Sequence, residues 1–563
     1  MMKYTFSKIY IATIALVVSI IPFYYNNQKE ATYLSIVLII IILASYNYLF
    51  KNNFHFDLKL NHLSIILVLT FFAILSQNIY LNFETIDWDV ASYLVASQDI
   101  ANGNVPNQYQ WESKGPVLFY FYYLLMLFAG KNFLIFKLLN DLILIVITIF
   151  LYLTIYELSN KNKLKSIFSS LLFLVLMSQS WAVGEFSEIY SLFFISCASY
   201  LMVTKISDRY KYIYIGTLLA LSTLVNQGTI LFALPMLHYI FLDTRGKNLK
   251  NGLIKFITPG IIIHLLFLLY YSYHSILDVY ITTYIQIPLG YIQSNYANLY
   301  ELKVFFRSFY ESYHPIYFAL LSILIFLITQ LFTLFNRLSN YINDWIITFL
   351  ITSVIFYYVG SHNYYHHLIF FLFAISLSVI KIPNSQSLLI YSFISIASVL
   401  LIIQDGNQAV YNLKNTESLF EDYPLRKLSQ EIDMQFQNDY TVLALDHTLI
   451  LYYLDKPNYT YIIHPSNHAE DYIVKTLASL GKINENYLEE ILLYQDPDVI
   501  LCSARMIVKG NPTKNTLFNC AVDDYRKEYI KLDTTIYEQN LNLSYYVDPY
   551  REINVYIKKP VDS

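Results

Sequence analysis

Charged residues are scarce in this sequence, since Asp, Glu, Lys and Arg together make up 14% of its 563 residues. An ordinary soluble domain carries roughly 25% charged residues. The formal net charge is -4 and no basic run with interleaved aromatic residues appears, so nucleic acid is not an expected partner. The three cysteines form no zinc-binding pattern, and for Cys502 and Cys520 a disulfide and two free thiols are both open. The C-terminal region lacks a glycine-rich phosphate loop, so no nucleotide site of that kind is expected there.

Hydrophobic residues, by contrast, make up 56% of the chain and gather into nearly uncharged blocks of about 16 to 25 residues. Because only a helix satisfies its own backbone in lipid, each block predicts a membrane-spanning helix. The 55 Tyr and 39 Phe suit such a protein, since aromatic rings favour membrane interfaces. We therefore expect a polytopic α-helical membrane protein with about 13 spans, near residues 8–24, 31–50, 62–80, 133–156, 166–181, 186–204, 212–226, 229–242, 254–273, 316–335, 344–360, 365–380 and 386–404.

The charges in the loops predict the orientation of these spans. With the N-terminus in the cytoplasm, the basic loops ELSNKNKLK and KISDRYK fall on the inner side, as the positive-inside rule requires. The segment from Val117 to Gly130 is apolar but reaches only roughly 21 Å as a helix, short of a hydrocarbon core of about 30 Å. We expect it to lie in, or dip into, the outer face. The chain is thus predicted to be a multi-pass protein of the plasma (inner) membrane.

Three parts of the chain follow from this topology. Residues 1–60 form a hairpin of two spans, and no small-residue cleavage site separates the two, so the first block is an uncleaved span. Residues 61–404 form a transmembrane module whose first outer loop is 81–132. Residues 405–563 form an extracytoplasmic α/β domain, because a helical stretch at 471–494 alternates with β-like runs at 441–445, 459–463, 498–502 and 554–558.

The first outer loop contains the residues that suggest chemistry. Its sequence, ETIDWDVASYLVASQDIANGNVPNQYQWESKGPVLFY, places Asp87 and Asp89 where the third span leaves the membrane. If the loop folds back, a carboxylate such as Asp89 or Glu112 meets Lys114. A carboxylate can accept a proton from a hydroxyl, and a lysine can neutralise a departing phosphate. In the alternative interpretation, Asp87 or Asp89 caps the helix predicted over Val90 to Ala101, and Lys114 is an interfacial snorkelling residue.

An ordered set of residues in this loop resembles the first outer loop of GT-C superfamily glycosyltransferases, in particular family 39. That family includes the protein O-mannosyltransferases and the lipid A aminoarabinose transferases. Val90 and Gly115 depart from its pattern, in which Glu and Pro are common at these places, and Asp87 is the candidate substitute for the missing acid. The residues in register are Asp89, Tyr93, Gly103, Pro106, Glu112, Lys114 and Pro116.

Later segments are similar to the same family. Residues 216–235 resemble its membrane hairpin, with Asn226 or Gln227 near a position where Lys is frequent. Residues 361–377 resemble its late His-Tyr segment. A bundle of membrane helices followed by an outer α/β domain also matches the family.

The resemblance implies an inverting glycosyltransferase that moves a sugar from a polyprenyl-phosphate donor to a glycan, lipid or protein acceptor. The reaction would take place on the outer face of the membrane. Asp89 would be catalytic, either deprotonating or orienting the acceptor hydroxyl, with Asp87 beside it. Residues that bind substrate would be Tyr93, Glu112, Lys114, Glu185, Glu188, His366 and His367. No particular cofactor follows from the sequence, and a divalent cation is a candidate.

The histidines and the two later acids also have plainer explanations. His362 and His366 are four residues apart, the spacing of metal-ligand pairs on a helix, but interfacial hydrogen bonding is the simpler explanation for each His. Glu185 and Glu188 could hold the acceptor or a divalent cation, or they could be solvated loop acids. No chemistry is assigned to the histidines of the C-terminal domain, namely His447, His464 and His468.

A transporter or flippase of a lipid-linked substrate is a hypothesis from another class. Transporters often have paired repeats and charged residues at mid-membrane. This sequence has no clear repeat, and most of its candidate charges lie at an outer interface. A surface-polysaccharide polymerase or ligase would also use lipid-linked sugars, but its large functional loop usually comes late in the chain.

Overall fold

The computed structural model describes residues 61–84, 87–205, 208–244, 248–294, 344–359, 364–381, 384–436, 439–491, 497–503, 529–534 and 553–559. The predicted spans at 8–24, 31–50 and 316–335 lie outside the described residues, as do His362 and Cys520.

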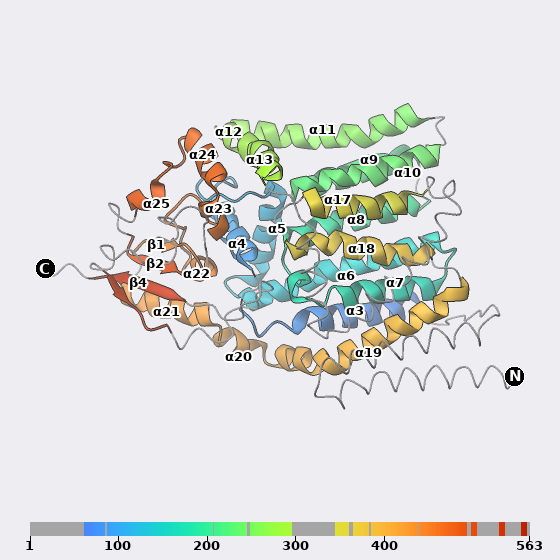
Figure 1. The fold of residues 1–563 in the computed structure, drawn as a ribbon, viewed down its shortest axis with the longest axis horizontal. Helices are drawn as coiled ribbons and strands as arrows, with labels where there is room; N and C mark the ends of the chain where they lie inside the picture. The colour runs from blue at the N-terminus through green and yellow to red at the C-terminus, as the bar shows by residue number, and fades with distance from the viewer. Residues whose placement is uncertain are drawn as a thin grey trace.

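Apolar helices lie side by side in a bundle that forms one half of the molecule (Figure 1). Two of them, α6 (Phe133–Leu158) and α11 (Leu249–Tyr273), are long and apolar enough to cross a membrane by length and composition. The described helices agree with the predicted blocks within about five residues, except that α19 (Asn384–Lys414) continues ten residues beyond the predicted end at 404. The agreement follows because each long apolar block can satisfy its backbone only as a helix. The other helices of the bundle are α3 (His62–Asn78), α7 (Lys163–Leu176), α8 (Ser187–Val203), α9 (Asp208–Thr223), α10 (Ala233–Thr244), α17 (Trp345–Val359), α18 (Ile369–Ser378) and α19 (Asn384–Lys414).

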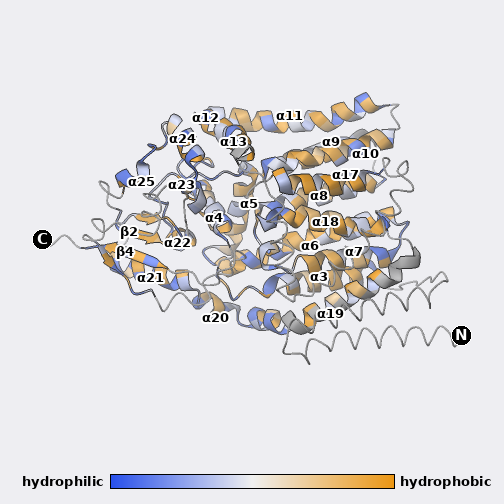
Figure 2. Cartoon of the chain, viewed as in Figure 1, coloured by the Kyte–Doolittle hydropathy of each residue, from blue (hydrophilic) through white to orange (hydrophobic). Residues whose placement is uncertain are grey.

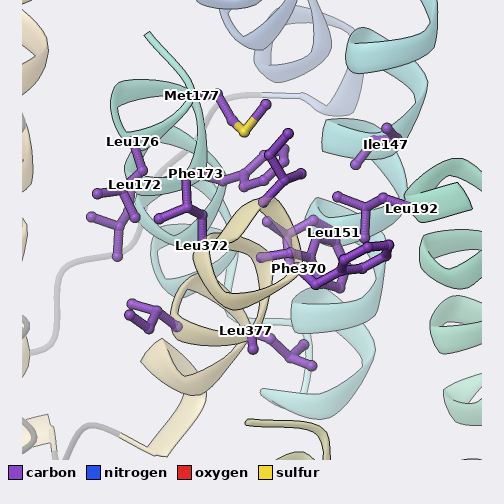
Figure 3. Close-up of a cluster of buried hydrophobic side chains, with 14 of the residues drawn as sticks. Ile147, Leu151, Leu172, Phe173, Leu176, Met177, Leu192, Phe370, Leu372 and Leu377 are labelled. Atoms are coloured by element: carbon purple, nitrogen blue, oxygen red, sulfur yellow. The ribbon is translucent and has the colours of Figure 1, made fainter. Parts of the chain in front are cut away.

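The bundle has a packed interior and an apolar exterior. Side chains of α6, α7, α8 and α18, including Leu151, Phe173 and Phe370, interlock in a buried cluster (Figure 3). On α11, in contrast, Ile261 and Leu269 are 55% and 65% exposed. Exposed apolar helix faces of this kind cover the bundle, which is predominantly hydrophobic (Figure 2). Lipid, rather than water, is the solvent that suits such a surface.

The predicted first outer loop folds between the bundle and the C-terminal domain (Figure 1). It contains α4 (Trp88–Ala101) and α5 (Pro116–Ala129), which lie beside each other at the end of the bundle (Figure 1). The helix predicted from Val90 is thus present. The apolar segment after Pro116 is a short helix, as predicted from its length. The segment after α11 is also helical, with α12 (Leu277–Ile281), the π-helical turn η3 (Thr282–Gln286) and α13 (Ile287–Ser294).

The C-terminal region contains a four-stranded sheet in the order β1-β2-β4-β3. Strands β1 (Val442–Ala444) and β2 (Val499–Cys502) are parallel, and β4 (Asn554–Lys558) runs antiparallel to both β2 and β3 (Tyr529–Lys531). The helices of this region are α20 (Thr416–Glu421), α21 (Pro424–Phe436), α22 (Leu449–Leu454), α23 (Pro465–Ala469), α24 (Asp471–Ser479) and α25 (Tyr487–Glu490). The predicted mixture of strands and helices is therefore present.

Two details of that prediction were wrong. The run at 459–463 is not a strand of the sheet, because its backbone binds the first outer loop instead, through an isolated bridge between Ile462 and Trp111. The stretch at 471–494 is not one helix, since α24 ends at Ser479 and α25 begins at Tyr487. Strand β3 was not predicted at all.

The C-terminal domain is tied to the segment that follows the C-terminal end of α3. The buried carboxylate of Glu84 accepts hydrogen bonds from the backbone N–H groups of Leu425 and Arg426, at 2.6 and 3.0 Å, and so caps the start of α21. The Tyr423 hydroxyl donates to the carbonyl of Leu81 at 2.5 Å. Because these bonds are buried, they fix how the domain meets the bundle.

Candidate active site

Asp87 and Asp89 lie at the start of α4 and play different parts. The Asp87 carboxylate accepts a hydrogen bond from the backbone N–H of Asp89 at 3.1 Å, so Asp87 is the N-cap of α4. This confirms the capping interpretation for Asp87. The Asp89 carboxylate instead accepts from the hydroxyl of Tyr93, one helical turn later, at 2.7 Å.

His464 of the C-terminal domain holds the other oxygen of Asp89. Its Nε2 lies 2.8 Å from Asp89 Oδ1, and the side chain is buried. Its Nδ1 accepts from the backbone N–H of Ser466 at 3.2 Å, where His464 caps α23. Since a backbone N–H can only donate, the ring hydrogen lies on Nε2 and is donated to Asp89. Sequence reasoning assigned this His no chemistry.

The neighbouring Trp88 is bound by the same domain. Its indole Nε1 donates to Asp446 Oδ1 at 2.7 Å, and the hydroxyl of Ser503 donates to Asp446 Oδ2. Asp446 is buried, so these charge-assisted bonds are shielded from water. The DWD motif is therefore fixed by two contacts from the C-terminal domain, one on Trp88 and one on Asp89.

The WESK motif is held by the segment that leads to His464. The backbone N–H of Trp111 donates to the carbonyl of Tyr461 at 2.6 Å, and the N–H of Ile463 donates to the carbonyl of Trp111 at 3.3 Å. The Trp111 indole donates to Thr283 at 2.8 Å. Residues 461–463 of the C-terminal domain thus bind the backbone of the WESK motif, and the next residue, His464, contacts Asp89.

Glu112 is buried, with 2% of its side chain exposed. Its Oε1 accepts from the backbone N–H and the hydroxyl of Ser113, at 2.7 and 2.8 Å. Burial raises the pKa of Glu112 above its ordinary value and the charge of Asp89 adds to this effect, while His464 and the Ser113 bonds oppose it only in part.

Lys114 lies among four carboxylates. Burial by itself lowers the pKa of Lys114, but the charges of Glu188, Asp89 and Glu112, with a smaller effect from Asp87, outweigh burial and raise it. Its ammonium stands 6.0 Å from the centre of the Tyr93 ring. For Asp89, burial acts in the opposite direction and raises the pKa, but His464, Lys114 and His366 together hold the pKa of Asp89 well below its usual range. Lys114 is therefore a cation and Asp89 a carboxylate.

The backbone around Lys114 rests on the turn between α9 and α10. The N–H of Gly115 donates to the carbonyl of Val225 at 3.1 Å, and the Gln227 side chain donates to the carbonyl of Ser113 at 2.9 Å. A Cβ on Gly115 would lie 2.1 Å from the carbonyl oxygen of Leu224, closer than real Cβ contacts allow. This close approach explains why glycine stands at this position.

Glu188, in the first turn of α8, is the fourth carboxylate that interacts with Lys114. It is fully buried and accepts from the amide of Asn226 at 2.8 Å, while Oε1 lies 3.5 Å from Nε2 of His367. Asn226, near the family's Lys position, is thus a neutral donor to this acid. His366 is stacked on Phe186, with ring centres 4.5 Å apart, and its Nε2 is 3.8 Å from Asp89 Oδ2.

The solvated-acid interpretation of Glu185 and Glu188 is therefore wrong, because both are buried. They nevertheless face different groups. Glu185 interacts electrostatically with Lys137 of α6, and burial raises the pKa of Glu185 to about 7 although that lysine opposes the shift. Glu185 precedes α8 whereas Glu188 is in its first turn, so the helix directs only Glu188 toward Lys114.

Two groups of side chains have the composition and spacing of metal ligands, with ligand atoms within 4.8 Å of one another: Glu188 with His366 and His367, and Asp87 with Asp89 and His464. Mixed imidazole and carboxylate donors suit zinc or manganese. The ammonium of Lys114 interacts with Glu188 of the first group and with Asp89 and Asp87 of the second, so it supplies part of the positive charge that an ion would supply.

Comparison with known proteins gives a structural match but no sequence match. No protein-family model and no curated protein matches the chain. The crystal structure of ArnT from Cupriavidus metallidurans bound to undecaprenyl phosphate matches with a TM-score of 0.55 at 11% identity, covering 88% of this chain and 97% of that one. Its apo structure matches with a TM-score of 0.54 at the same identity and coverage. At this identity the likeness establishes the fold alone, so the chain has the fold seen in the two ArnT structures.

Proposed function

We propose that the chain is a membrane glycosyltransferase that moves a sugar from a polyprenyl-phosphate donor to an acceptor on the outer face of the membrane. The observation that carries the proposal is the convergence of a lysine cation and a fixed carboxylate, Lys114 and Asp89, beside Tyr93 at the end of the helical bundle. A structural neighbour of the same fold was solved with undecaprenyl phosphate, which supports a lipid phosphate as part of the donor.

The roles of the residues follow from the chemistry of the transfer. The donor's phosphate leaves with the electron pair of the bond to the sugar, and the Lys114 ammonium neutralises the charge that develops there. Asp89, anchored by His464 and Tyr93, fixes the acceptor hydroxyl relative to the sugar. Attack by that hydroxyl in a single displacement inverts the anomeric carbon. The acceptor is a glycan, a lipid or a protein, and the chain lies in the plasma membrane with its C-terminal domain outside.

The first test identifies the substrates in cells with and without the gene. Mass spectrometry of lipid-linked sugars and surface glycans should show a polyprenyl-phosphate sugar accumulating and one sugar missing from an acceptor. Restoring the gene should reverse both changes. Asp89→Asn should not reverse them, although the variant protein is inserted in the membrane at the normal level. Unchanged glycans and lipids in the deletion strain would contradict the proposal.

A second test separates a transferase from a transporter or flippase. In detergent micelles the membrane has no two sides, so net transport has no meaning there. Purified protein in detergent, given lipid extract from the deletion strain and acceptor from the same cells, should still form glycosylated product. Product formed only in sealed vesicles would favour the transporter.

A further inference from the structure

Glu112 differs from the other carboxylates around Lys114. Its Oε1 accepts two hydrogen bonds from Ser113, but its Oε2 is buried and has no hydrogen-bond partner among the described residues. Buried polar atoms in folded proteins are nearly always paired, and an exception calls for a ligand, a water or a catalytic role. Glu112 is buried, with 2% of its side chain exposed, so water at the protein surface does not explain the unpaired atom.

The other three acids already have hydrogen-bond donors. Asp89 accepts from His464 on one oxygen and from Tyr93 on the other. Glu188 accepts from Asn226 on Oε1 and from the Ser187 hydroxyl on Oε2, at 2.8 and 3.2 Å. The third acid, Asp87 at the N-cap of α4, accepts from the backbone N–H of Asp89.

These donors make Asp89 a weak proton acceptor. Each hydrogen bond and each nearby positive charge stabilises the ionised carboxylate and so opposes its protonation. Both oxygens of Asp89 accept such a bond, one from His464 and one from Tyr93, whereas both bonds to Glu112 are on Oε1. Glu112 has an unpaired oxygen in a buried setting, where burial favours the protonated form and raises its pKa. Of the two, Glu112 is therefore the stronger base.

We propose that Glu112 Oε2 is the general base for the transfer and that Asp89 is a positioning residue for the acceptor hydroxyl. This assignment rests on the proposed glycosyltransferase function and implies an acceptor that reacts through a hydroxyl. The acceptor's O–H bond breaks and its proton passes to Oε2. The hydroxyl oxygen bonds to the anomeric carbon, while the bond from that carbon to the phosphate oxygen breaks. The electron pair leaves with the polyprenyl phosphate beside the ammonium of Lys114.

The groups that face Glu112 come from each element packed around it. Asp89 and Tyr93 are on α4, His464 is at the start of α23, and Lys114 follows in the same loop. Transfer of the proton to Glu112 removes one negative charge from the cluster of four carboxylates around Lys114, which are Asp87, Asp89, Glu112 and Glu188. The arrangement thus favours proton transfer to Glu112.

The decisive variant is Glu112→Gln, which keeps the size of the side chain and an oxygen that accepts hydrogen bonds but removes its basicity. Transfer to the natural acceptor should fall by roughly 100-fold or more, with the KM for donor lipid extract changed little. A variant that transfers at the wild-type rate would show that Glu112 only accepts a hydrogen bond, and would overturn the assignment. Glu485→Gln makes the same chemical change at an exposed position of the C-terminal region and is the matched control.

Azide as the acceptor separates a base from a structural residue, because azide attacks the sugar without losing a proton. Wild type and Glu112→Gln should form glycosyl azide from the donor lipid at similar rates, measured by mass spectrometry. If the variant also fails with azide while its thermal unfolding is unchanged, Glu112 binds the donor and the base assignment is wrong. If wild type transfers to no acceptor at all, the proposed function fails instead, so the two failures are distinguishable.

Discussion

His464 Nε2 lies 2.8 Å from Asp89 Oδ1, and this contact joins two residues that are 375 positions apart in the chain. Asp89 belongs to α4 in the predicted first outer loop, and His464 belongs to the domain that follows the helical bundle. The candidate site is consequently built by two parts of the molecule, and the C-terminal domain is a structural part of it rather than an appendage.

Replacing His464 with Ala should lower transfer by roughly 10- to 100-fold, because a carboxylate that is free to rotate no longer fixes the acceptor hydroxyl. His464→Gln should retain more activity than His464→Ala, since an amide N–H can still donate to Asp89. Initial rates with saturating donor lipid provide the measurement. His274→Ala, at an exposed position, is the control. Equal rates for His464→Ala and wild type would rule out a positioning role for His464.

Lys114→Met should reduce transfer by about 100-fold or more, because the developing phosphate charge loses its cation. Methionine has a similar length, so packing against Tyr93 is largely kept. Binding of undecaprenyl phosphate, measured by quenching of tryptophan fluorescence, should weaken in the same variant. Lys427→Met, in an exposed ion pair with Asp422, should change neither quantity. Normal lipid binding and transfer in Lys114→Met would place the phosphate elsewhere.

Gly115→Ala should destabilise the protein and impair the site together. The added methyl would lie 2.1 Å from the Leu224 carbonyl oxygen, so the backbone beside Lys114 must shift. Overpacking of this kind costs about 1 to 3 kcal/mol. Gly260→Ala is the matched control, because a Cβ there meets nothing within 4 Å. Thermal unfolding in detergent should show a lower midpoint for Gly115→Ala alone, and identical midpoints would contradict the close approach.

Asp99 predicts a pH dependence of stability. Its Oδ2 accepts from the backbone N–H groups of Gln110 and Tyr109, at 2.9 and 3.3 Å. Burial raises the pKa of Asp99 from 3.8 to about 6, although these two bonds oppose the shift. The folded state thus holds this proton more tightly than the unfolded state, so the contribution to stability is fully present below pH 4 and is lost as pH rises to 6.

The change should be at most about 3 kcal/mol. Unfolding midpoints measured between pH 4 and 7 should therefore fall less steeply in Asp99→Asn than in wild type. Asp422→Asn, at an exposed position, should leave the wild-type slope unchanged. A wild-type slope in Asp99→Asn would show that other groups cause the pH dependence.

Several features could be predicted from the sequence because their cause is local. Long uncharged blocks predict helices such as α6 and α11, since lipid leaves the backbone no other partner. The helix after Asp87 follows from a capping residue, a run of helix-forming residues and a terminating glycine. The pairing of Asp89 with Lys114 was expected from a resemblance to a family pattern, and the structure places their charges in one cluster.

Other features could not be predicted because their partners are distant in sequence. The run at 459–463 has the composition of a strand, but it binds Trp111 of the outer loop instead of a neighbouring strand. Glu185 and Glu188 look equivalent in the sequence, yet one faces Lys137 and the other faces Lys114. No sequence pattern indicated a role for Asp446, because its partner, Trp88, precedes it by 358 residues.

The sequence by itself determined the helical bundle, the short helix after Pro116, the mixed C-terminal domain and the residue types needed for phosphate and proton chemistry. Periodicity, apolar length and charge placement are properties of neighbouring residues, so they can be seen along the chain. Tertiary structure alone decided that His464 holds Asp89 and that Glu112 keeps an oxygen without a partner among the described residues. Docking of one domain on another sets these contacts, and no local pattern encodes which surfaces will meet.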